Sequence, residues 1–323
     1  MSIVTLSAPD VPDAVIDGSA AARGMILRGL SSWLSSPDAK VDLTERLAGD
    51  GAHDVQDAQI LYSARTVTVE YRLLADTAHD RNQVLDMQSH LRMFLHRMVR
   101  VRVQDDAHDL YCEGYVDSID TEQTTQNMNW QFLTGQIIVV CPRPELLSSL
   151  ERGCQLQCAS LENGSGGLSY YPQDDFLATA WLGDPNNSVS VLFDTLEGDE
   201  GIHYPLTYYL DDDDAAASNT GVVTNAGSSR AYPIFRVHGP MPDGVDLEFP
   251  GTGLRLQCSL PVYEGSKLIL DSRTRTASVN GVDVSETLIS RGFPTVPPQG
   301  GLSLLLRTVG GGWVDVESHD TYI

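Results

Sequence analysis

Hydrophobic and polar residues alternate with a period of two along residues 65–74, and this alternation predicts a half-buried strand. Val67 and Val69 fall on the apolar face of that strand. The period changes over residues 81–98, where apolar residues recur at spacings of three and four. Asp80 stands at the position of an N-cap for the first turn. The two patterns therefore predict a strand that is followed by an amphipathic helix.

Short apolar runs predict further strands in the first part of the chain. These expected strands cover residues 3–6, 25–30, 99–103, 110–119 and 129–140. Residues 105–109 are expected to form a hairpin loop between two of them, and residues 145–151 are expected to form a short helix. The first part of the chain is thus predicted to be mostly β with one long helix.

The second part of the chain consists of short apolar runs that clusters of Gly, Pro, Asp or Asn separate. The expected strands cover residues 177–182, 189–193, 204–210, 234–237, 245–249, 254–260, 268–270, 278–284, 302–307 and 314–317. Regular short strands with turn signals are typical of a β-sandwich. Because a single core rarely grows beyond about 250–300 residues, the 323 residues predict two domains, residues 1–143 and 144–323.

Asn280 and Gly281 stand between two apolar runs of this second part. Both residue types tolerate the positive φ that a two-residue hairpin turn requires. The strand before the turn is expected to end at Val279, and Val282 and Val284 are expected to pair back against it. The dipeptide therefore predicts a β-hairpin.

A set of short motifs accompanies this hairpin. Around it they read Leu270, Asp271, Arg275-Thr276, Val279, Asn280-Gly281, Phe293-Pro294 and Pro298-Gln299-Gly300. Elsewhere they read Tyr204-Pro205-Leu206, Asn225-Ala226-Gly227, Tyr232-Pro233-Ile234-Phe235-Arg236-Val237, Gly239-Pro240 and Tyr322-Ile323. In these motifs the sequence resembles the distal tail protein family of long non-contractile tailed phages, the siphophages. The family residues that we single out are Pro205, Pro233, Gly239, Pro240, Asp271, Asn280, Gly281, Phe293 and Pro294.

The resemblance implies a fold, a function and a set of partners. Residues 1–143 would form a tail-tube-like β-domain with a flanking helix, and residues 144–323 a galectin-like β-sandwich. The protein would be a non-enzymatic structural component of the virion tail tip, assembled in the host cytoplasm without a cofactor. Six copies would form a ring that joins the tail tube to the tail hub and to receptor-binding or fibre proteins. DNA would pass through the channel of this ring without being bound tightly.

A second hypothesis stays open, in which the chain is a carbohydrate-binding adhesin module. Aromatic side chains of a sandwich can line a sugar-binding groove, although packing in the core is the simpler explanation for them. The aromatic candidates are Tyr170, Tyr171, Trp181, Tyr204, Tyr208 and Tyr209. The oligomeric state distinguishes the two hypotheses, because only the first requires a closed ring.

The chain is strongly acidic, with 44 acidic and 21 basic residues and a formal net charge of −23. Residues 1–143 hold 20 acidic and 12 basic residues, a net charge of −8. Binding to phosphates needs clustered Lys and Arg, so we expect no tight binding of nucleic acid. The longest apolar run, residues 137–141, is far shorter than the roughly 20 residues of a membrane span. Residues 1–18 lack the charged and apolar regions of a signal peptide.

Motifs for catalysis or metal binding are weak. The acidic run at residues 211–214 lacks the spacing of an EF-hand, and a solvated loop is expected there. The five cysteines form no Cys-x-x-Cys pattern and are expected to stay reduced. The neighbouring pairs His53-Asp54, His79-Asp80 and His319-Asp320 occur without the sequence context of a nucleophile. We therefore expect no enzyme activity, no metal site and no cofactor.

Overall fold

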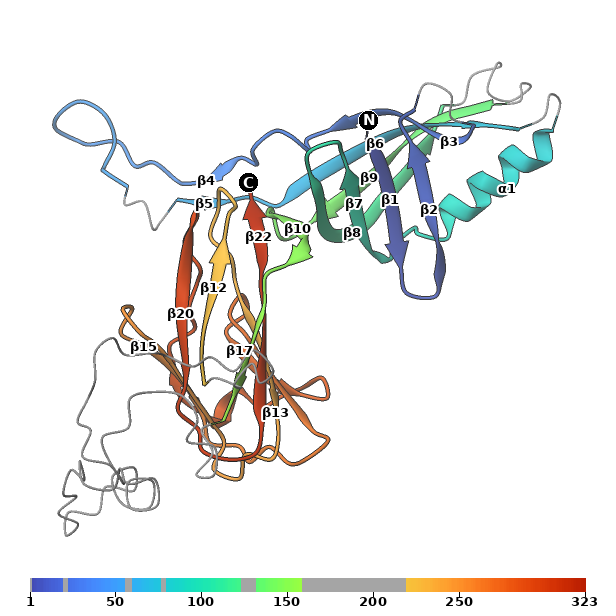
Figure 1. The fold of residues 1–323 in the computed structure, drawn as a ribbon. Coiled ribbons are helices and arrows are strands. Elements are labelled where there is room, and N and C mark those ends of the chain that lie inside the picture. Colours follow the sequence, from blue (N-terminus) through green and yellow to red (C-terminus); the bar gives the residue numbers. More distant parts are fainter. Residues whose placement is uncertain (1, 20–22, 56–59, 77–79, 123–131, 159–218) are drawn as a thin grey trace, which may run out of the picture. The chain divides into compact units, whose positions relative to one another are not determined.

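The computed structural model describes residues 2–19, 23–55, 60–76, 80–122, 132–158 and 219–323, which form a mainly β structure (Figure 1). The contacts divide the chain into two compact units. Unit 1 comprises residues 1–151, 226–229 and 319–323, and unit 2 comprises residues 152–225 and 230–318. The expectation that residues 1–143 and 144–323 are domains that fold independently stays a prediction.

Unit 1 is built on one sheet that closes into a barrel. Its strands are β1 (Ile3–Ala8), β2 (Val11–Asp17), β3 (Gly24–Ser31), β6 (Arg65–Leu74), β7 (Met98–Gln104), β8 (Asp109–Thr121), β9 (Phe132–Cys141), β10 (Leu146–Glu151) and β22 (His319–Tyr322). They follow the order β22-β10-β8-β7-β1-β2-β3-β6-β9, and an additional pairing joins β8 to β9. This last pairing joins the two ends of the run β8-β7-β1-β2-β3-β6-β9, so these seven strands form a closed barrel.

The alternation over residues 65–74 correctly predicts β6, the strand that pairs with β3 on one side and β9 on the other. Its alternate side chains Val67, Val69, Tyr71 and Leu73 are fully inaccessible to solvent. Burying each such side chain contributes about 1.5–3 kcal/mol to folding. The period-two pattern therefore places β6 in the middle of the barrel core.

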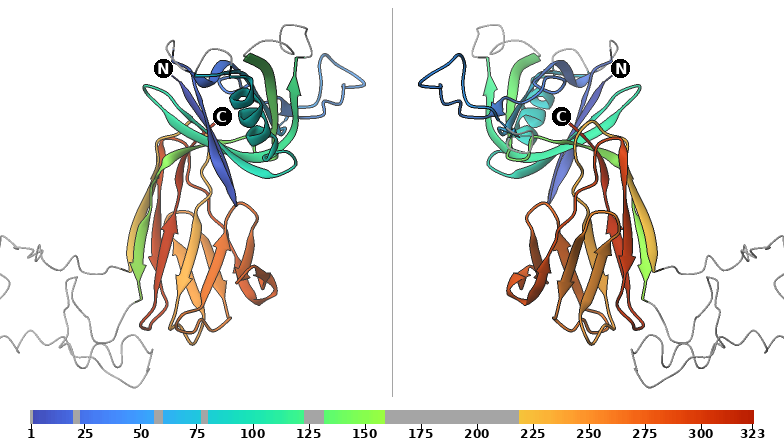
Figure 2. Two further views of the ribbon diagram at one scale, coloured as in Figure 1. Left: turned by 90° about the vertical axis from the view of Figure 1, so that its right-hand side faces the viewer. Right: turned by 90° about the vertical axis from the view of Figure 1, so that its left-hand side faces the viewer.

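The helix that follows is α1 (Arg81–Arg92), and it is shorter than the predicted helix over residues 81–98. Its start is as expected, because the Asp80 carboxylate accepts a hydrogen bond of 3.1 Å from the backbone N–H of Gln83. The helix ends early because His96 has a φ of 56° and Met98 already pairs with Tyr115 as the first residue of β7. α1 packs against β3, β6 and β9 at one end of the barrel (Figures 1 and 2).

The prediction of a short helix over residues 145–151 is wrong, because residues 146–151 form the strand β10. A helix of this length makes few hydrogen bonds, whereas a strand here has partners on both sides. Leu147 is the register partner of Tyr111 on β8 and of Thr321 on β22. Both neighbours lie far from β10 in the sequence, and β22 itself falls outside the strands that the sequence predicts.

Unit 2 is a β-sandwich, as predicted. One sheet contains β11 (Cys154–Gln157), β21 (Trp313–Glu317), β13 (Ile234–His238), β16 (Lys267–Asp271), β17 (Thr276–Val279) and β18 (Val282–Asp283). The other contains β12 (Thr220–Asn225), β20 (Gly300–Leu306), β14 (Val245–Phe249), β15 (Leu254–Cys258) and β19 (Leu288–Arg291). The two sheets share one apolar core, in which the rings of Phe235 and Phe249 lie 5.7 Å apart. The strands expected at residues 177–182, 189–193 and 204–210 lie outside the described residues.

The predicted hairpin is present. Asn280 has a φ of 52° and Gly281 a φ of 80°, and Val279 pairs with Val282 across this two-residue turn. β18 is short, and its partner β17 also pairs with β16. A short 3-10 helix, η2 (Ser285–Thr287), follows and leads into β19.

Candidate functional site

Asp271, a residue of the family motif, forms the turn between β16 and β17. Its carboxylate accepts hydrogen bonds from the backbone N–H groups of Arg273 at 2.7 Å and Thr274 at 3.3 Å. Its carbonyl accepts another from the N–H of Arg275 at 2.8 Å. An Asp side chain that binds amides just ahead of it in the chain stabilises a tight turn. Asp271 therefore has a structural role in this hairpin.

The other motif residues lie at turns and close approaches of the backbone. A Cβ on Gly239 would lie 2.3 Å from the carbonyl oxygen of Val262, so only glycine fits there. Pro240 follows it, and the buried Pro233 accepts a hydrogen bond from Ser272. The buried pair Phe293-Pro294 follows β19, and Pro205 lies outside the described residues. Gly239 and Pro233 thus have local structural roles in unit 2, as Asp271 does.

The chain between β3 and β6 forms an arm, defined here as residues 32–55 and 60–64. It carries the two-stranded pairing of β4 (Ala39–Lys40) with β5 (Leu61–Tyr62) and leaves the barrel at the end away from α1 (Figure 1). Large apolar side chains of the arm are exposed, including Leu34, Leu43, Leu47 and Leu61. Leu43 is 66% exposed and Leu47 fully so. The arm was not predicted from the sequence, although its leucines among polar residues are a signal for it.

Arg65 anchors the arm. Its buried guanidinium donates hydrogen bonds to the carbonyl oxygens of Ser32, Trp33 and Ser35 at the start of the arm. The Nε of Arg65 donates to the carbonyl of Pro144 at 2.8 Å. One buried cation thus satisfies four backbone acceptors that would otherwise cost about 1–3 kcal/mol each. Arg65 therefore fixes the base of the arm to the barrel, while the leucines of the arm are exposed to solvent.

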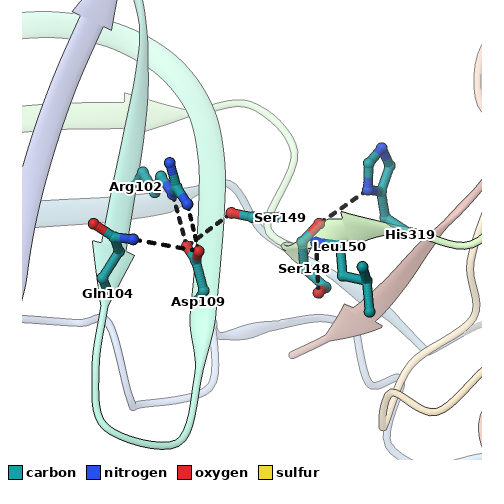
Figure 3. Close-up of polar contacts among 7 residues, drawn as sticks. All are labelled: Arg102, Gln104, Asp109, Ser148, Ser149, Leu150 and His319. Atoms are coloured by element: carbon teal, nitrogen blue, oxygen red, sulfur yellow. Dashed lines mark hydrogen bonds and ion pairs between the residues drawn. The ribbon is translucent and has the colours of Figure 1, made fainter.

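Asp109, the first residue of β8, is the centre of a polar network between β7, β8 and β10 (Figure 3). Its carboxylate accepts hydrogen bonds from Nε of Arg102 at 2.7 Å and from the hydroxyl of Ser149 on β10 at 2.8 Å. The hydrogen bonds from the Arg102 guanidinium hold the pKa of Asp109 below its usual value. The network therefore joins β7 and β8 to β10.

His319 and Asp320, a candidate pair from the sequence, do not act together. Nδ1 of His319 lies 2.9 Å from the carbonyl oxygen of Ser148, as Figure 3 shows, and its ring stands edge-on to Tyr111. The carboxylate of Asp320 instead accepts a hydrogen bond of 2.7 Å from the N–H of Ala226. Successive residues of a strand point to opposite faces, which is why the two side chains separate. They hold β22 in place.

The arginines of β7 are occupied by acidic partners. Arg100 forms an ion pair of 2.7 Å with Glu113 and lies over the ring of Tyr111, and Arg102 pairs with Asp109. A pocket elsewhere in unit 1 has three carboxylates and one arginine in its lining. The lining residues are Arg28, Glu70, Tyr71, Asp120, Thr121, Glu122, Thr134, Gly135 and Gln136. The β7 arginines are paired with carboxylates, and the pocket holds three carboxylates for its one arginine, so neither surface favours the binding of phosphate.

Across the described residues, no three His, Cys, Asp or Glu side chains are placed to bind a metal ion together. The acidic run at residues 211–214 and the six aromatic candidates for sugar binding lie outside those residues. No described helix is long and apolar enough to cross a membrane.

Comparisons with known proteins find similarity in structure. No family model and no curated protein matches the sequence. The solved structure of the Dit protein (gp 19.1) of phage SPP1 is similar over 93% of this chain and 94% of its own, with a TM-score of 0.54 and 11% identity. That protein is described as a paradigm of the hub adsorption apparatus in phages that infect Gram-positive bacteria.

Two structures of the phage p2 baseplate in its activated conformation, with Ca and with Sr, are similar over 98% of both chains. Their TM-scores are 0.47 and 0.48, at 7% identity. At 11% identity, the likeness to SPP1 Dit shows the fold. The chain therefore has the fold of a phage distal tail protein, the family that its C-terminal motifs resemble.

Proposed function

We propose that this chain is a structural protein of a siphophage tail tip. Six copies form a ring that joins the tail tube to the hub and the receptor-binding apparatus, and the ring leaves a channel for DNA. The fold shared with SPP1 Dit along nearly the whole chain supports a role in a tail. The closed barrel with its extended arm is the part of the molecule that supports ring formation.

The observation that carries the proposal is the arm. Leu43 and Leu47 belong to neither apolar core of the described residues, and both are largely or fully exposed. Burying a leucine on association removes the cost of its contact with water, about 1.5–3 kcal/mol for each side chain. Large exposed apolar side chains grouped on one segment mark surfaces for protein partners. In our proposal, the neighbouring copy in the ring covers these leucines.

A ring places conditions on the contact. In a cyclic hexamer one face of each copy meets a different face of the next, so the arm of one copy contacts a surface other than the neighbour's arm. The rigid base at Arg65 favours this arrangement, because an arm fixed in direction loses less entropy on binding.

The charge of the chain suits a channel that conducts DNA. A net charge of −8 for residues 1–143 amounts to about −48 in six copies. Unpaired lysines and arginines would bind phosphates, whereas carboxylates repel the duplex and let it pass. The pairing of the β7 arginines with Glu113 and Asp109 is consistent with this idea.

The mass of the purified protein tests the proposal. Mass photometry should find a species near 211 kDa, six times the chain mass of 35.2 kDa. The double variant Leu43→Asp, Leu47→Asp should shift the population to monomers that still unfold in a cooperative transition, at a temperature no longer raised by assembly. Tyr263→Asp, at a side chain in unit 2 that is 71% exposed, is the matched control and should leave the hexamer intact. If the double variant still forms hexamers, the arm is not part of the interface. If the wild-type protein is a monomer in assembled tails, the proposal of a ring is wrong.

One observation keeps the second hypothesis, sugar binding, worth a test. On one sheet of the sandwich the rings of His238 and Trp313 stack at 4.7 Å, and Nε2 of His238 lies 3.0 Å from a carboxylate oxygen of Asp315. Aromatic faces beside hydrogen-bonding groups are suited to sugar rings. Titration with host cell-wall saccharides, followed by tryptophan fluorescence, would show a saturable change in wild type that Trp313→Ala abolishes.

A further inference from the structure

Two thiols meet inside the barrel of unit 1. Cys112 lies on β8 and Cys141 is the last residue of β9, and their Sγ atoms are 3.3 Å apart. Both side chains are buried, and both cysteines are free. The sulfur atoms are therefore in contact at the place where β8 and β9 close the barrel.

A glycine makes this contact possible. The register of β8 and β9 begins with Tyr115 opposite Val140, which places Gly114 opposite Cys141. A Cβ on Gly114 would lie 2.8 Å from Sγ of Cys141 and 2.4 Å from the carbonyl oxygen of Val140. Any larger residue at this position would displace the thiol. Gly114 thus leaves the space through which Cys141 reaches Cys112.

A buried cation lies next to this pair. Arg65 is the register partner of Cys141 between β6 and β9. Its Nη2 is buried and has no hydrogen-bond partner among the described residues. The pKa of Cys141 is lowered because its thiolate accepts a hydrogen bond from the thiol of Cys112, and Arg65 lowers it further. The thiolate is the form of cysteine that reacts with oxidants.

We propose that Cys112 and Cys141 are a modification site at which a peroxide forms a disulfide between β8 and β9. The sulfur of Cys141 attacks hydrogen peroxide, breaks its O–O bond and becomes a sulfenic acid while one water leaves. The sulfur of Cys112 then attacks that sulfenic sulfur, and the hydroxyl group leaves as a second water. Two thiols lose two electrons and two protons, and one peroxide becomes two waters.

The disulfide would connect residues 29 positions apart and covalently close the barrel. It would be absent in a reducing cytoplasm and would form in an oxidising environment. This inference does not depend on the proposed tail function, because it follows from unit 1 alone.

The other three cysteines provide the comparison. Burial raises the pKa of Cys158 to about 11 and also raises that of Cys154. Cys258 contacts the hydroxyl of Thr287 at 3.1 Å. Among the described residues, Cys112 and Cys141 are the one pair with a sulfur–sulfur contact.

The test uses the full-length protein, incubated with hydrogen peroxide for hours, because buried thiols react only after local opening. After removal of the oxidant and unfolding, the number of free thiols should fall from five to three. A protease that cuts after glutamate separates the two cysteines at Glu113 and Glu122. The unreduced digest should contain a disulfide-linked pair of peptides, one with Cys112 and the other with Cys141. The mass of this pair should be smaller than the sum of the two peptide masses by two hydrogen atoms. The melting temperature should rise by about 5–10 °C and return on reduction.

Single variants complete the test. Cys141→Ala should keep all four remaining thiols after treatment, whereas the control Cys154→Ala should lose two of four. Five free thiols in treated wild type, a link through any other cysteine, or sulfinic acid without a link would each overturn the proposal. If Cys141→Ala does not fold, the wild-type digest decides the question alone.

Discussion

The hairpin at Asn280-Gly281 and the arm before Arg65 both extend from a sheet, but they differ in where their apolar side chains go. The hairpin turns back after two residues with positive φ, and its strand β17 buries Ala277 in the sandwich core. The arm continues outward, and Leu43 and Leu47 remain exposed. A segment that buries its own apolar residues stabilises its own unit. A segment that does not is available to a partner, so we expect assembly to depend on unit 1.

The largest effect should come from cutting the chain. A fragment of residues 144–323 should fold alone, because the entire sandwich core lies between Leu156 and Val316. A shorter fragment of residues 152–318 should fold too. Compared with the longer fragment it lacks only β10 and β22, which pair with each other in unit 1. Each should give a cooperative thermal transition and resist limited proteolysis. Rapid digestion of both fragments would show that the sandwich depends on unit 1.

Replacing Arg65 should have the next largest effect. Arg65→Met leaves the carbonyl oxygens of Ser32, Trp33, Ser35 and Pro144 without their donor, so unit 1 should lose more than about 3 kcal/mol of stability. Urea denaturation measures this loss. Arg100→Met is the matched control, because its half-exposed ion pair with Glu113 should be worth less than about 1 kcal/mol. Equal losses in the two variants would mean that Arg65 does not anchor the arm.

Changing Gly281 should have a smaller effect, confined to unit 2. Gly281→Val puts a β-branched residue at a φ of 80° and should cost about 1–3 kcal/mol. No atom lies within 4 Å of the added Cβ, so the cost is backbone strain alone. Gly281→Asn tolerates this φ and should cost less. Thermal melting of the two variants separates these outcomes, and equal midpoints would argue against strain at this turn.

Local signals in the sequence predict the elements that depend on neighbouring residues. The alternation at β6, the cap at Asp80 and the Asn280-Gly281 turn are of this kind, and the structure confirms all three. β10 was mistaken for a helix because the choice depends on β8 and β22, which lie far away in the chain.

Features of the candidate sites were harder to predict for the same reason. The contact between Cys112 and Cys141 and the reach of Arg65 to Ser32 depend on strand register, which single-sequence patterns do not determine. The exposure of Leu43 and Leu47 was equally hard to predict, because a leucine in a polar stretch is buried in one fold and exposed in another.

The smallest predicted effect concerns pH and the network around Asp109. Its pKa is lowered in the folded state by Arg102, so it stabilises unit 1 above the unfolded pKa of about 3.9. This contribution is lost as the pH falls through the lower, folded pKa. Because the pair is more than a third exposed, the effect should stay below about 1 kcal/mol.

Asp109→Asn should therefore lose less stability than wild type between pH 7 and pH 3, measured by urea denaturation at each pH. Asp54→Asn, which removes a carboxylate that is 98% exposed in its ion pair with Arg46, is the matched control, because so exposed a pair adds little to stability. Comparing the two variants shows whether the network that holds β10 to the barrel contributes more to stability than an exposed ion pair on the arm does. If Asp109→Asn follows wild type as closely as Asp54→Asn does, the network adds nothing measurable to the stability of unit 1.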